Sequence, residues 1–438
     1  MPNPGSELAA TFRELTHTSR SLRIAIVGIF AGSVLLRGLI LASATPVLVS
    51  DARDYHVLAK NLAAGQGYIQ HYEGETAAFN GFTFRAFRPP GYPIILAGLG
   101  SIFGWSLHVP LVANIAADLV TQACLLLIAL RLFGIGSAVA VQVLLGLHVL
   151  WIPNPMTESI HTALFSLLAL LLIFGWPLRS FAGALGFGLI TCAALFIRPI
   201  TICVFPALLW KFIQEHRSWR GIICLLLTGL PSLAGMSAWT VRNYRLFEEF
   251  VPFTTNIGHH NAWDYDLHAD RAFLHLRQQR LNEAQINKAL IRAEREFYID
   301  NPGKCLVRYL WRAMALFSLK PAWETEQVLW ELVLPIRPSG TYIPHLYHTM
   351  FWQYYVTYIL AACGAGILVL RRRELAGLWT LMICYVLIHA MVSRGDMRLA
   401  APLYPLMCLL ATTLFSAGSR QAPGHKESHG NNTVMNQA

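Results

Sequence analysis

The chain alternates between long apolar runs and shorter polar stretches. A helix needs about 20 apolar residues to cross the roughly 30 Å hydrocarbon core of a bilayer. Runs close to this length recur along the sequence, and they predict an all-α polytopic membrane protein with about 10 transmembrane helices. Some runs are short, so the count could change by one or two. The expected spans are 24–48, 108–130, 136–152, 160–177, 181–197, 200–214, 221–240, 350–370, 376–393 and 399–416.

The basic residues between these spans predict the orientation of the chain. Loops that face the cytoplasm carry an excess of Lys and Arg. With ten spans, both termini and most of the basic residues fall on one side, which we therefore assign to the cytoplasm. These residues are Arg13, Arg20, Arg23, Arg131, Arg179, Lys211, Arg217, Arg220, Arg371, Arg372, Arg373, Arg420 and Lys426.

This orientation divides the chain into regions. Residues 1–22 form a cytoplasmic tail, because they are too polar for a signal peptide. Residues 23–417 form one transmembrane domain, whose loops 51–107 and 241–349 face outward and carry interfacial helices. Residues 418–438 are polar and are expected to be a disordered cytoplasmic tail.

The composition supports a membrane protein and excludes other classes. Of 438 residues, 55% are hydrophobic and 13% are charged, whereas soluble domains carry about 25% charged residues. The net charge of +10 fits loops that face anionic lipid. No basic run with interleaved aromatic residues is present, so a nucleic-acid partner is set aside. Seven of the eight cysteines lie in apolar segments, which excludes an external disulfide framework.

The first external loop contains the residues on which the rest of the interpretation depends. Asp51 and Asp54 open an amphipathic helix that Gly65 and Gly67 end. Two prolines then hold Arg88 on a stiff segment before a second apolar helix. An acid and a guanidinium held at the lipid boundary suit a reaction on a membrane-borne phosphate. Alternatively, Asp51 is a helix N-cap and Arg88 contacts a lipid headgroup. In the amphipathic pattern, Tyr55, Leu58, Ala59 and Leu62 fall on one face of the helix.

The second external loop carries several further candidates. Arg242 lies at the outer end of a span, and residues 282–300 have the spacing of an amphipathic helix, with Ile286, Leu290, Ala293 and Phe297 on one face. Segment 304–320 is expected to be interfacial. A stretch rich in His and Asp could hold a metal, but its spacing matches no ligand motif, so no metal site is assigned to it. Its members are His259, His260, Asp264, Asp266, His268, Asp270 and His275.

Ionisable residues inside a membrane are costly and therefore informative. Arg37 and Asp118 fall at similar depths in the first two spans, so we expect them to pair, which could serve only to fix helix packing. Glu158 follows two prolines in a short external turn, where Thr157 or Ser159 could cap the next helix. Two cations, Arg394 and Arg398, stand at the external end of the last two spans and favour phosphate binding.

The series of motifs resembles the GT-C superfamily of polyprenyl-phosphate-sugar-dependent glycosyltransferases. The nearest branches are the protein O-mannosyltransferase-like enzymes and the lipid A aminoarabinose transferase. The match runs in order over most of the chain. It rests on Asp51-Ala-Arg-Asp54-Tyr55, Leu62-x-x-Gly65-x-Gly67-Tyr68, Arg88-Pro-Pro-Gly-Tyr-Pro93, Thr157-Glu158-Ser159, Arg198-Pro199, Trp239-x-x-Arg242-Asn243-Tyr244 and Arg398-x-x-x-Pro402-x-x-Pro405.

The resemblance implies transfer of a sugar from a polyprenyl-phosphate donor to an acceptor hydroxyl, with inversion, at the external face of the plasma (inner) membrane. Asp51 stands four residues before Tyr55, as the family's catalytic aspartate does, so Asp51 is the expected base. Ala52 replaces the second acid that many members have beside it. Where relatives have a lysine before the two prolines, this chain has Arg88, which binds phosphate bidentately.

The remaining roles follow from the same resemblance. Asp54 and Glu158 would orient the acceptor or the sugar, Tyr55 would stack or hydrogen-bond, and Arg242 and Arg398 are further candidates for the donor phosphate. No cofactor is certain. A divalent cation could replace part of this cation set, with Asp51 and Glu158 as its ligands. The acceptor, whether lipid, glycan or protein, is not specified.

Two other classes of protein remain as alternatives. A transporter or flippase of a lipid-linked or anionic substrate would also have about ten spans, but its functional charges would lie at the midplane, on broken helices in matched halves. A non-catalytic membrane scaffold would leave Asp51, Glu158 and Arg88 unexplained.

Overall fold

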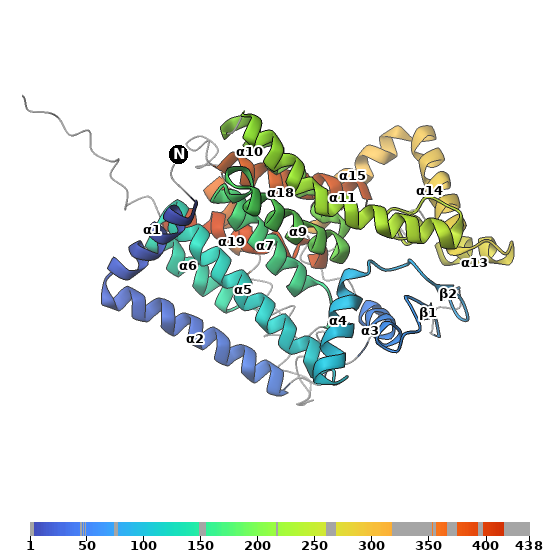
Figure 1. The fold of residues 1–438 in the computed structure, drawn as a ribbon, viewed down its shortest axis with the longest axis horizontal. Helices are drawn as coiled ribbons and strands as arrows, with labels where there is room; N and C mark the ends of the chain where they lie inside the picture. Colours follow the sequence, from blue (N-terminus) through green and yellow to red (C-terminus); the bar gives the residue numbers. More distant parts are fainter. Residues whose placement is uncertain are drawn as a thin grey trace, which may run out of the picture.

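Helices make up nearly all of the regular structure in the computed structural model (Figure 1). The structure describes residues 4–43, 46, 48, 50–73, 78–148, 155–215, 218–259, 269–317, 353, 356–365, 375–392 and 397–415. The expected tail 418–438 and much of the expected span 350–370 lie outside these residues. The helical fold class that the apolar pattern predicts is confirmed.

Three helices are long and apolar enough to cross a membrane. They are α2 (Arg20–Ser43), α5 (His108–Phe133) and α11 (Trp219–Phe247). Each coincides with an expected span, at 24–48, 108–130 and 221–240. These three predictions are confirmed.

The other expected spans correspond to shorter apolar helices, so helix length does not confirm the number ten. Backbone-breaking residues account for the short lengths. Gly134, with φ of 85°, ends one helix where the next begins, and Pro199 starts a 3₁₀ turn after α9. The short elements are α6 (Ile135–Gly146), α7 (Glu158–Ile173), α9 (Phe181–Ile197), η1 (Pro199–Cys203), α10 (Val204–Glu215), α18 (Ala376–Val392), η3 (Met397–Ala400), α19 (Tyr404–Ala411), η4 (Thr412–Phe415) and the apolar helix Val356–Ala365.

The main hydrophobic core lies where α5, α6, α7, α9, α18 and α19 meet, around residues such as Leu125, Phe165 and Leu409. At one end of the molecule, Glu7 of α1 (Pro4–His17) contacts the four-residue helix α8 (Trp176–Arg179) and the end of α5. Its carboxylate accepts hydrogen bonds from Arg131 at 3.3 Å and Arg179 at 3.0 Å. Three regions that the charge pattern assigns to the cytoplasm therefore meet in space.

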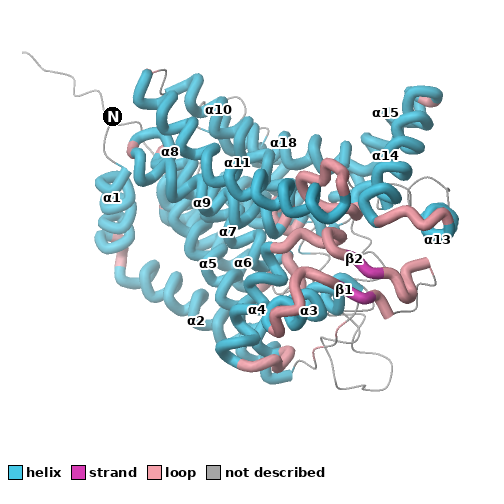
Figure 2. Tube along the Cα trace, turned by 45° about the vertical axis from the view of Figure 1, so that its right-hand side comes forward, coloured by secondary structure: helices cyan, strands magenta, loops and turns pink. Residues whose placement is uncertain are grey.

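The two expected external loops gather at the opposite end of the molecule from α1 (Figures 1 and 2). The first loop contains α3 (Ser50–Ala63), the antiparallel strands β1 (Gln70–His71) and β2 (Thr83–Phe84), and α4 (Gly91–Phe103). The second contains α13 (Ala269–Gln278), α14 (Glu283–Asp300) and α15 (Pro302–Leu316). The sequence pattern did not predict the two strands, in which Gln70 pairs with Phe84 and His71 with Thr83.

The predicted amphipathic helix at 282–300 is confirmed as α14. Asn282 and Gln285 form a capping box at its start, which fixes the direction of the helix. Ile286 and Leu290 pack into an aromatic cluster of Phe79, Phe84, Phe87 and Phe273, which joins the two loops. Ala293 is exposed and Phe297 is half-buried, so only the first two turns face this core.

The predicted pair of Arg37 and Asp118 is also confirmed. Arg37 is fully buried, and its Nε donates to the Asp118 carboxylate at 2.6 Å. Its other nitrogens donate to the carbonyl oxygens of Leu145, Gly146 and His148, each at 3.0 Å. These carbonyls lie at the end of α6, which is too short to cross the hydrocarbon core. Because lipid offers them no hydrogen bond, Arg37 acts as the cap of α6.

Replacing Arg37 by glutamine should destabilise the helical bundle, because it leaves Asp118 and three carbonyl groups buried without their partner. We expect the free energy of unfolding to fall by about 3–5 kcal/mol. Unfolding in mixed detergent micelles measures this change. Arg20→Gln is the matched control, since Arg20 lies exposed on the same helix and should change the stability by less than about 0.5 kcal/mol. Equal effects of the two variants would contradict the capping role.

Candidate functional site

Helix α3 positions the acidic residues of the candidate site. Of the predicted face, Tyr55, Leu58 and Ala59 are buried and Leu62 is half-buried, and Ala52, which was not predicted, is buried as well. Gly65 and Gly67 follow the helix with φ of 73° and 87°, a conformation that suits glycine. The helix begins at Ser50, so Asp51 lies within its first turn, where an acid also interacts favourably with the helix dipole.

The structure brings Arg88 to both aspartates of α3. Its Nη2 donates to Asp51 Oδ1 at 2.6 Å and to Asp54 Oδ2 at 2.8 Å, and its Nε donates to Asp54 Oδ2 at 3.0 Å. All three side chains are largely buried, with 10%, 13% and 7% of the Arg88, Asp51 and Asp54 side chains exposed. Nη1 of Arg88 has no hydrogen-bond partner among the described residues. This nitrogen is therefore available to a ligand.

The two aspartates have different surroundings. Asp54 accepts from Arg88 through Oδ2 and from Gln70 Nε2 through Oδ1, at 2.5 Å, so both its oxygens are engaged. Burial raises the pKa of Asp54, and Arg88 opposes this rise. Burial lowers the pKa of Arg88, but Asp51 and Asp54 raise it by more, so the guanidinium stays charged. Asp54 therefore holds Arg88 in place, whereas Asp51 lies nearer the open edge of the cluster.

Tyr55 stands between this cluster and a second buried ion pair. Its ring lies 5.1 Å from the ring of Tyr92 and 5.9 Å from the Arg88 guanidinium carbon. Burial, together with Asp51, raises the pKa of Tyr55 to about 12. Tyr55 is therefore protonated at neutral pH, and it can donate a hydrogen bond but cannot serve as a base.

The second ion pair joins Glu158 to Arg198. Arg198 Nη2 donates to Glu158 Oε1 at 2.6 Å, and Arg198 Nε donates to the Thr157 hydroxyl at 2.8 Å. The expectation that Thr157 or Ser159 caps the helix is wrong for Thr157. This residue occupies the N-cap position of α7, but its side chain makes no capping bond, and its hydroxyl accepts from Arg198.

The two ion pairs are neighbours. A Cβ added to Gly91, three residues after Arg88, would come within 2.6 Å of the Phe196 backbone, two residues before Arg198. The charges of Asp51, Arg88, Glu158 and Arg198 all influence the Tyr55 hydroxyl. Asp51 and Glu158, which the sequence predicts to lie at the same membrane face, therefore lie around the same tyrosine.

Sequence reasoning included Arg198 in a motif but gave it no role, and it missed Gln70 and His161. His161 is fully buried, and its Nε2 lies 2.8 Å from the Thr201 hydroxyl, whose hydrogen goes to the Arg198 carbonyl. The break at Arg198-Pro199 between two apolar runs is the signal that could have identified Arg198. No local pattern identifies Gln70, because its role depends on the β1–β2 pairing.

Arg242 and Arg398 are the other two candidates for binding the donor phosphate. Arg242 donates to the carbonyl oxygens of Arg85 at 2.8 Å and Tyr68 at 3.3 Å, and it lies 4.5 Å from the Trp239 ring centroid. It is therefore close to the first loop, but its donors are engaged by these backbone carbonyls and by Asn243 Oδ1, at 2.7 Å. Arg398 lies in η3, and its side chain is outside the described part of the chain, as is Arg394.

The two possible metal sites that the sequence raised have little support in the described residues. Most of the His- and Asp-rich stretch, residues 260–268, lies outside them, and His259 Nε2 is 3.4 Å from Asp270 Oδ1. Nowhere in the described ranges do three His, Cys, Asp or Glu side chains form a group that could hold a metal. Asp51 and Glu158 each contact a guanidinium, so these residues do not form a fitting divalent-cation site.

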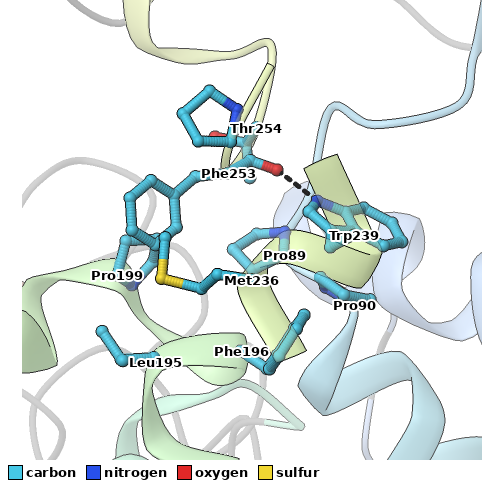
Figure 3. A pocket seen from close by; sticks show the side chains of 10 residues that line it. Pro89, Pro90, Leu195, Phe196, Pro199, Met236, Trp239, Phe253 and Thr254 are labelled. Atoms are coloured by element: carbon cyan, nitrogen blue, oxygen red, sulfur yellow. Dashed lines mark hydrogen bonds between the residues drawn. The ribbon is translucent and has the colours of Figure 1, made fainter. Parts of the chain in front are cut away.

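An apolar pocket adjoins the site (Figure 3). Pro89 and Pro90, which follow Arg88, form one wall, and Pro199, which follows Arg198, lies on another. Trp239 closes the pocket and donates from its indole Nε1 to the Phe253 carbonyl at 2.6 Å, as the dashed line in Figure 3 marks. The remaining lining residues are Leu195, Phe196, Met236, Pro252, Phe253 and Thr254. The apolar pocket is thus lined in part by the residues that directly follow Arg88 and Arg198 in the sequence.

Neutralising the two aspartates separately should distinguish their roles. Asp54→Asn removes charged hydrogen bonds from a buried guanidinium, so we expect the free energy of unfolding to fall by about 1–3 kcal/mol. Asp51→Asn should lower it by less than Asp54→Asn does, because Arg88 donates one hydrogen bond to Asp51 and two to Asp54, and it keeps the latter two. Unfolding in mixed micelles measures both. A larger loss in Asp51→Asn would show that Asp51 is the structural partner.

Comparison with known proteins gives a coarse likeness. No protein-family model matches the chain, and no curated protein matches it in sequence. Two solved structures of ArnT from Cupriavidus metallidurans are similar, each with 13% identity. The structure bound to undecaprenyl phosphate has a TM-score of 0.38, covering 89% of this chain and 77% of that one. The apo structure has a TM-score of 0.36, with coverages of 88% and 76%. ArnT is a lipid A aminoarabinose transferase of the GT-C type, one of the branches that the sequence motifs resemble.

Proposed function

We propose that this chain is a membrane glycosyltransferase that moves a sugar from a polyprenyl-phosphate donor to an acceptor hydroxyl, with inversion. The observation that carries the proposal is the contact of 2.6 Å between Asp51 Oδ1 and Arg88 Nη2. It brings together a carboxylate and a guanidinium, the proposed base and the proposed phosphate ligand, in the segment expected to be the first external loop. In the proposed topology, about ten spans cross the plasma (inner) membrane, and this site faces the periplasm or exterior.

Asp51 is the proposed base. The acceptor hydroxyl attacks the anomeric carbon and gives its proton to the Asp51 carboxylate, while the bond between that carbon and the phosphate oxygen breaks. A single displacement of this kind inverts the anomeric carbon. The leaving polyprenyl phosphate takes the electron pair and gains negative charge, which the preorganised Arg88 stabilises. Asp54 orients Arg88, while Glu158 and Tyr55 are proposed to orient the sugar or the acceptor.

The donor is proposed to bind with its phosphate at Arg88 and its first isoprene units in the adjacent apolar pocket. Arg88 Nη1 would receive the phosphate first. A phosphate that also takes Nη2 would displace Asp51 and leave its carboxylate available to the acceptor. Because Asp51 and Asp54 together carry two negative charges against one on Arg88, a further cation is required, for which Arg198, Arg242 and Arg398 are candidates.

The proposed chemistry predicts a change in the cell's surface molecules. Deleting the protein should remove one sugar substituent from a surface lipid, glycan or protein, and mass spectrometry of these fractions with and without the protein should detect the loss. Asp51→Asn, made at the normal level, should behave like the deletion because it removes the base. Unchanged surface molecules in the deletion, together with altered movement of a lipid-linked substrate, would favour a transporter.

The phosphate role of Arg88 predicts a binding defect in the purified protein. We expect the dissociation constant of undecaprenyl monophosphate to rise by about tenfold or more in Arg88→Gln, because a charged hydrogen bond contributes about 1.5–3 kcal/mol. Arg88→Lys should lose less, since it keeps the charge but not the bidentate geometry. Arg53→Gln is the matched control, because Arg53 lies exposed on α3. If Arg88→Gln and the control had equal affinities, Arg88 would not be a ligand of the phosphate.

A further inference from the structure

The backbone of Arg85 and Ala86, shortly before Arg88, is held by residues of the expected second external loop, 241–349. Both backbone N–H groups of Arg85 and Ala86 donate to one carboxylate, that of Glu283, at 2.8 Å and 2.6 Å. The Arg85 carbonyl accepts from Arg242 at 2.8 Å, and the Ala86 carbonyl accepts from the Thr255 N–H at 3.0 Å. All four backbone polar groups of these two residues therefore bond to residues beyond position 241.

Glu283 is placed rigidly for this contact. It is the first residue of α14 and is 4% exposed. The capping box of Asn282 and Gln285 fixes this end of the helix, and the positive end of the helix dipole lowers the cost of burying a carboxylate there. Its neighbour Ala284 packs with Ala86 in a small apolar cluster. A buried carboxylate that accepts two backbone N–H groups is a specific arrangement and not a solvated surface acid.

The position of Arg88 depends on this attachment. Ala86 is fully buried and stands two residues before Arg88, and the intervening Phe87 ring lies 5.0 Å from the guanidinium carbon. On the other side, the Tyr68 hydroxyl lies 2.8 Å from the Arg88 carbonyl oxygen. The backbone around Arg88 is thus fixed from both directions. Releasing residues 85 and 86 would free one of the two supports.

We infer that Glu283, on the second external loop, is a positioning residue that sets the place of the Arg88 guanidinium by holding the backbone at Arg85 and Ala86. The inference rests on the proposed function, because it assigns Glu283 a part in binding the donor phosphate. It makes the phosphate site a product of both external loops. Glu283 itself need not touch the substrate.

A double-mutant cycle tests whether Glu283 acts through Arg88. The dissociation constant of undecaprenyl monophosphate is measured for the purified full chain, for Glu283→Ala, for Arg88→Gln and for the double variant. Glu283→Ala should raise the constant by about tenfold when Arg88 is present and by less than about twofold in the Arg88→Gln background, because residues that act through each other are not additive. Glu283→Gln, which keeps one acceptor oxygen, should lose less than Glu283→Ala.

Glu249→Gln is the matched control. It removes a carboxylate that pairs with Lys288 of α14 at 2.7 Å, where 58% of the Lys288 side chain is exposed, and it leaves residues 85 and 86 untouched. Equal weakening by Glu283→Ala in both backgrounds would overturn the inference in favour of a general structural role, and no weakening in either would also overturn it.

Hydrogen–deuterium exchange separates failure of the inference from failure of the proposed function. The peptide that contains Arg85 and Ala86 should exchange faster in Glu283→Ala than in the unchanged chain or in Glu249→Gln, whatever the ligand is. If the unchanged chain and Arg88→Gln both fail to bind undecaprenyl monophosphate, the proposed function fails, while faster exchange still supports the holding role of Glu283. Unchanged exchange would overturn that role directly.

Discussion

The structure depends on the cost of placing a charge away from water. A buried ion is tolerated when an opposite charge and further hydrogen bonds satisfy it. Three guanidinium groups meet this condition, Arg37 with Asp118, Arg88 with Asp51 and Asp54, and Arg198 with Glu158. The first pair lies within the helical bundle and supports packing. The other two lie at the end where the two expected external loops gather, and the residues that follow Arg88 and Arg198 line an apolar pocket there.

Much of this arrangement could be predicted, because it depends on patterns within one helix or on the depth of a residue in the membrane. Helical periodicity identified α3 with most of its buried face and α14 with the buried face of its first two turns, since each pattern lies within one element. Counting residues from the membrane surface placed Arg37 opposite Asp118. The ordered motifs around Asp51 and Arg88 indicated that they belong to one site. The stiff Arg88-Pro89-Pro90 segment and the glycine-terminated helix α3 leave little freedom in how the first loop folds back.

Other features could not be predicted, because they depend on contacts between distant segments. Glu283 lies nearly two hundred positions after Arg85, and it is an ordinary first-turn acid by its local sequence. Gln70 reaches Asp54 only through a strand pair with no regular alternation in sequence. The expected spans near α6 and α19 are longer than the helices themselves, since hydropathy registers apolar composition and not where glycine or proline interrupts a helix.

The arginine at the end of α6 has a consequence for how the chain is assembled. Arg37 and the groups it contacts, Asp118 and the carbonyls of Leu145, Gly146 and His148, all lie within the first 148 of the 438 residues. A nascent chain released as far as residue 148 therefore contains every member of this network. Its first helices can close around the charge before the later helices are synthesised, and they then provide a finished surface on which α7 and α19 pack.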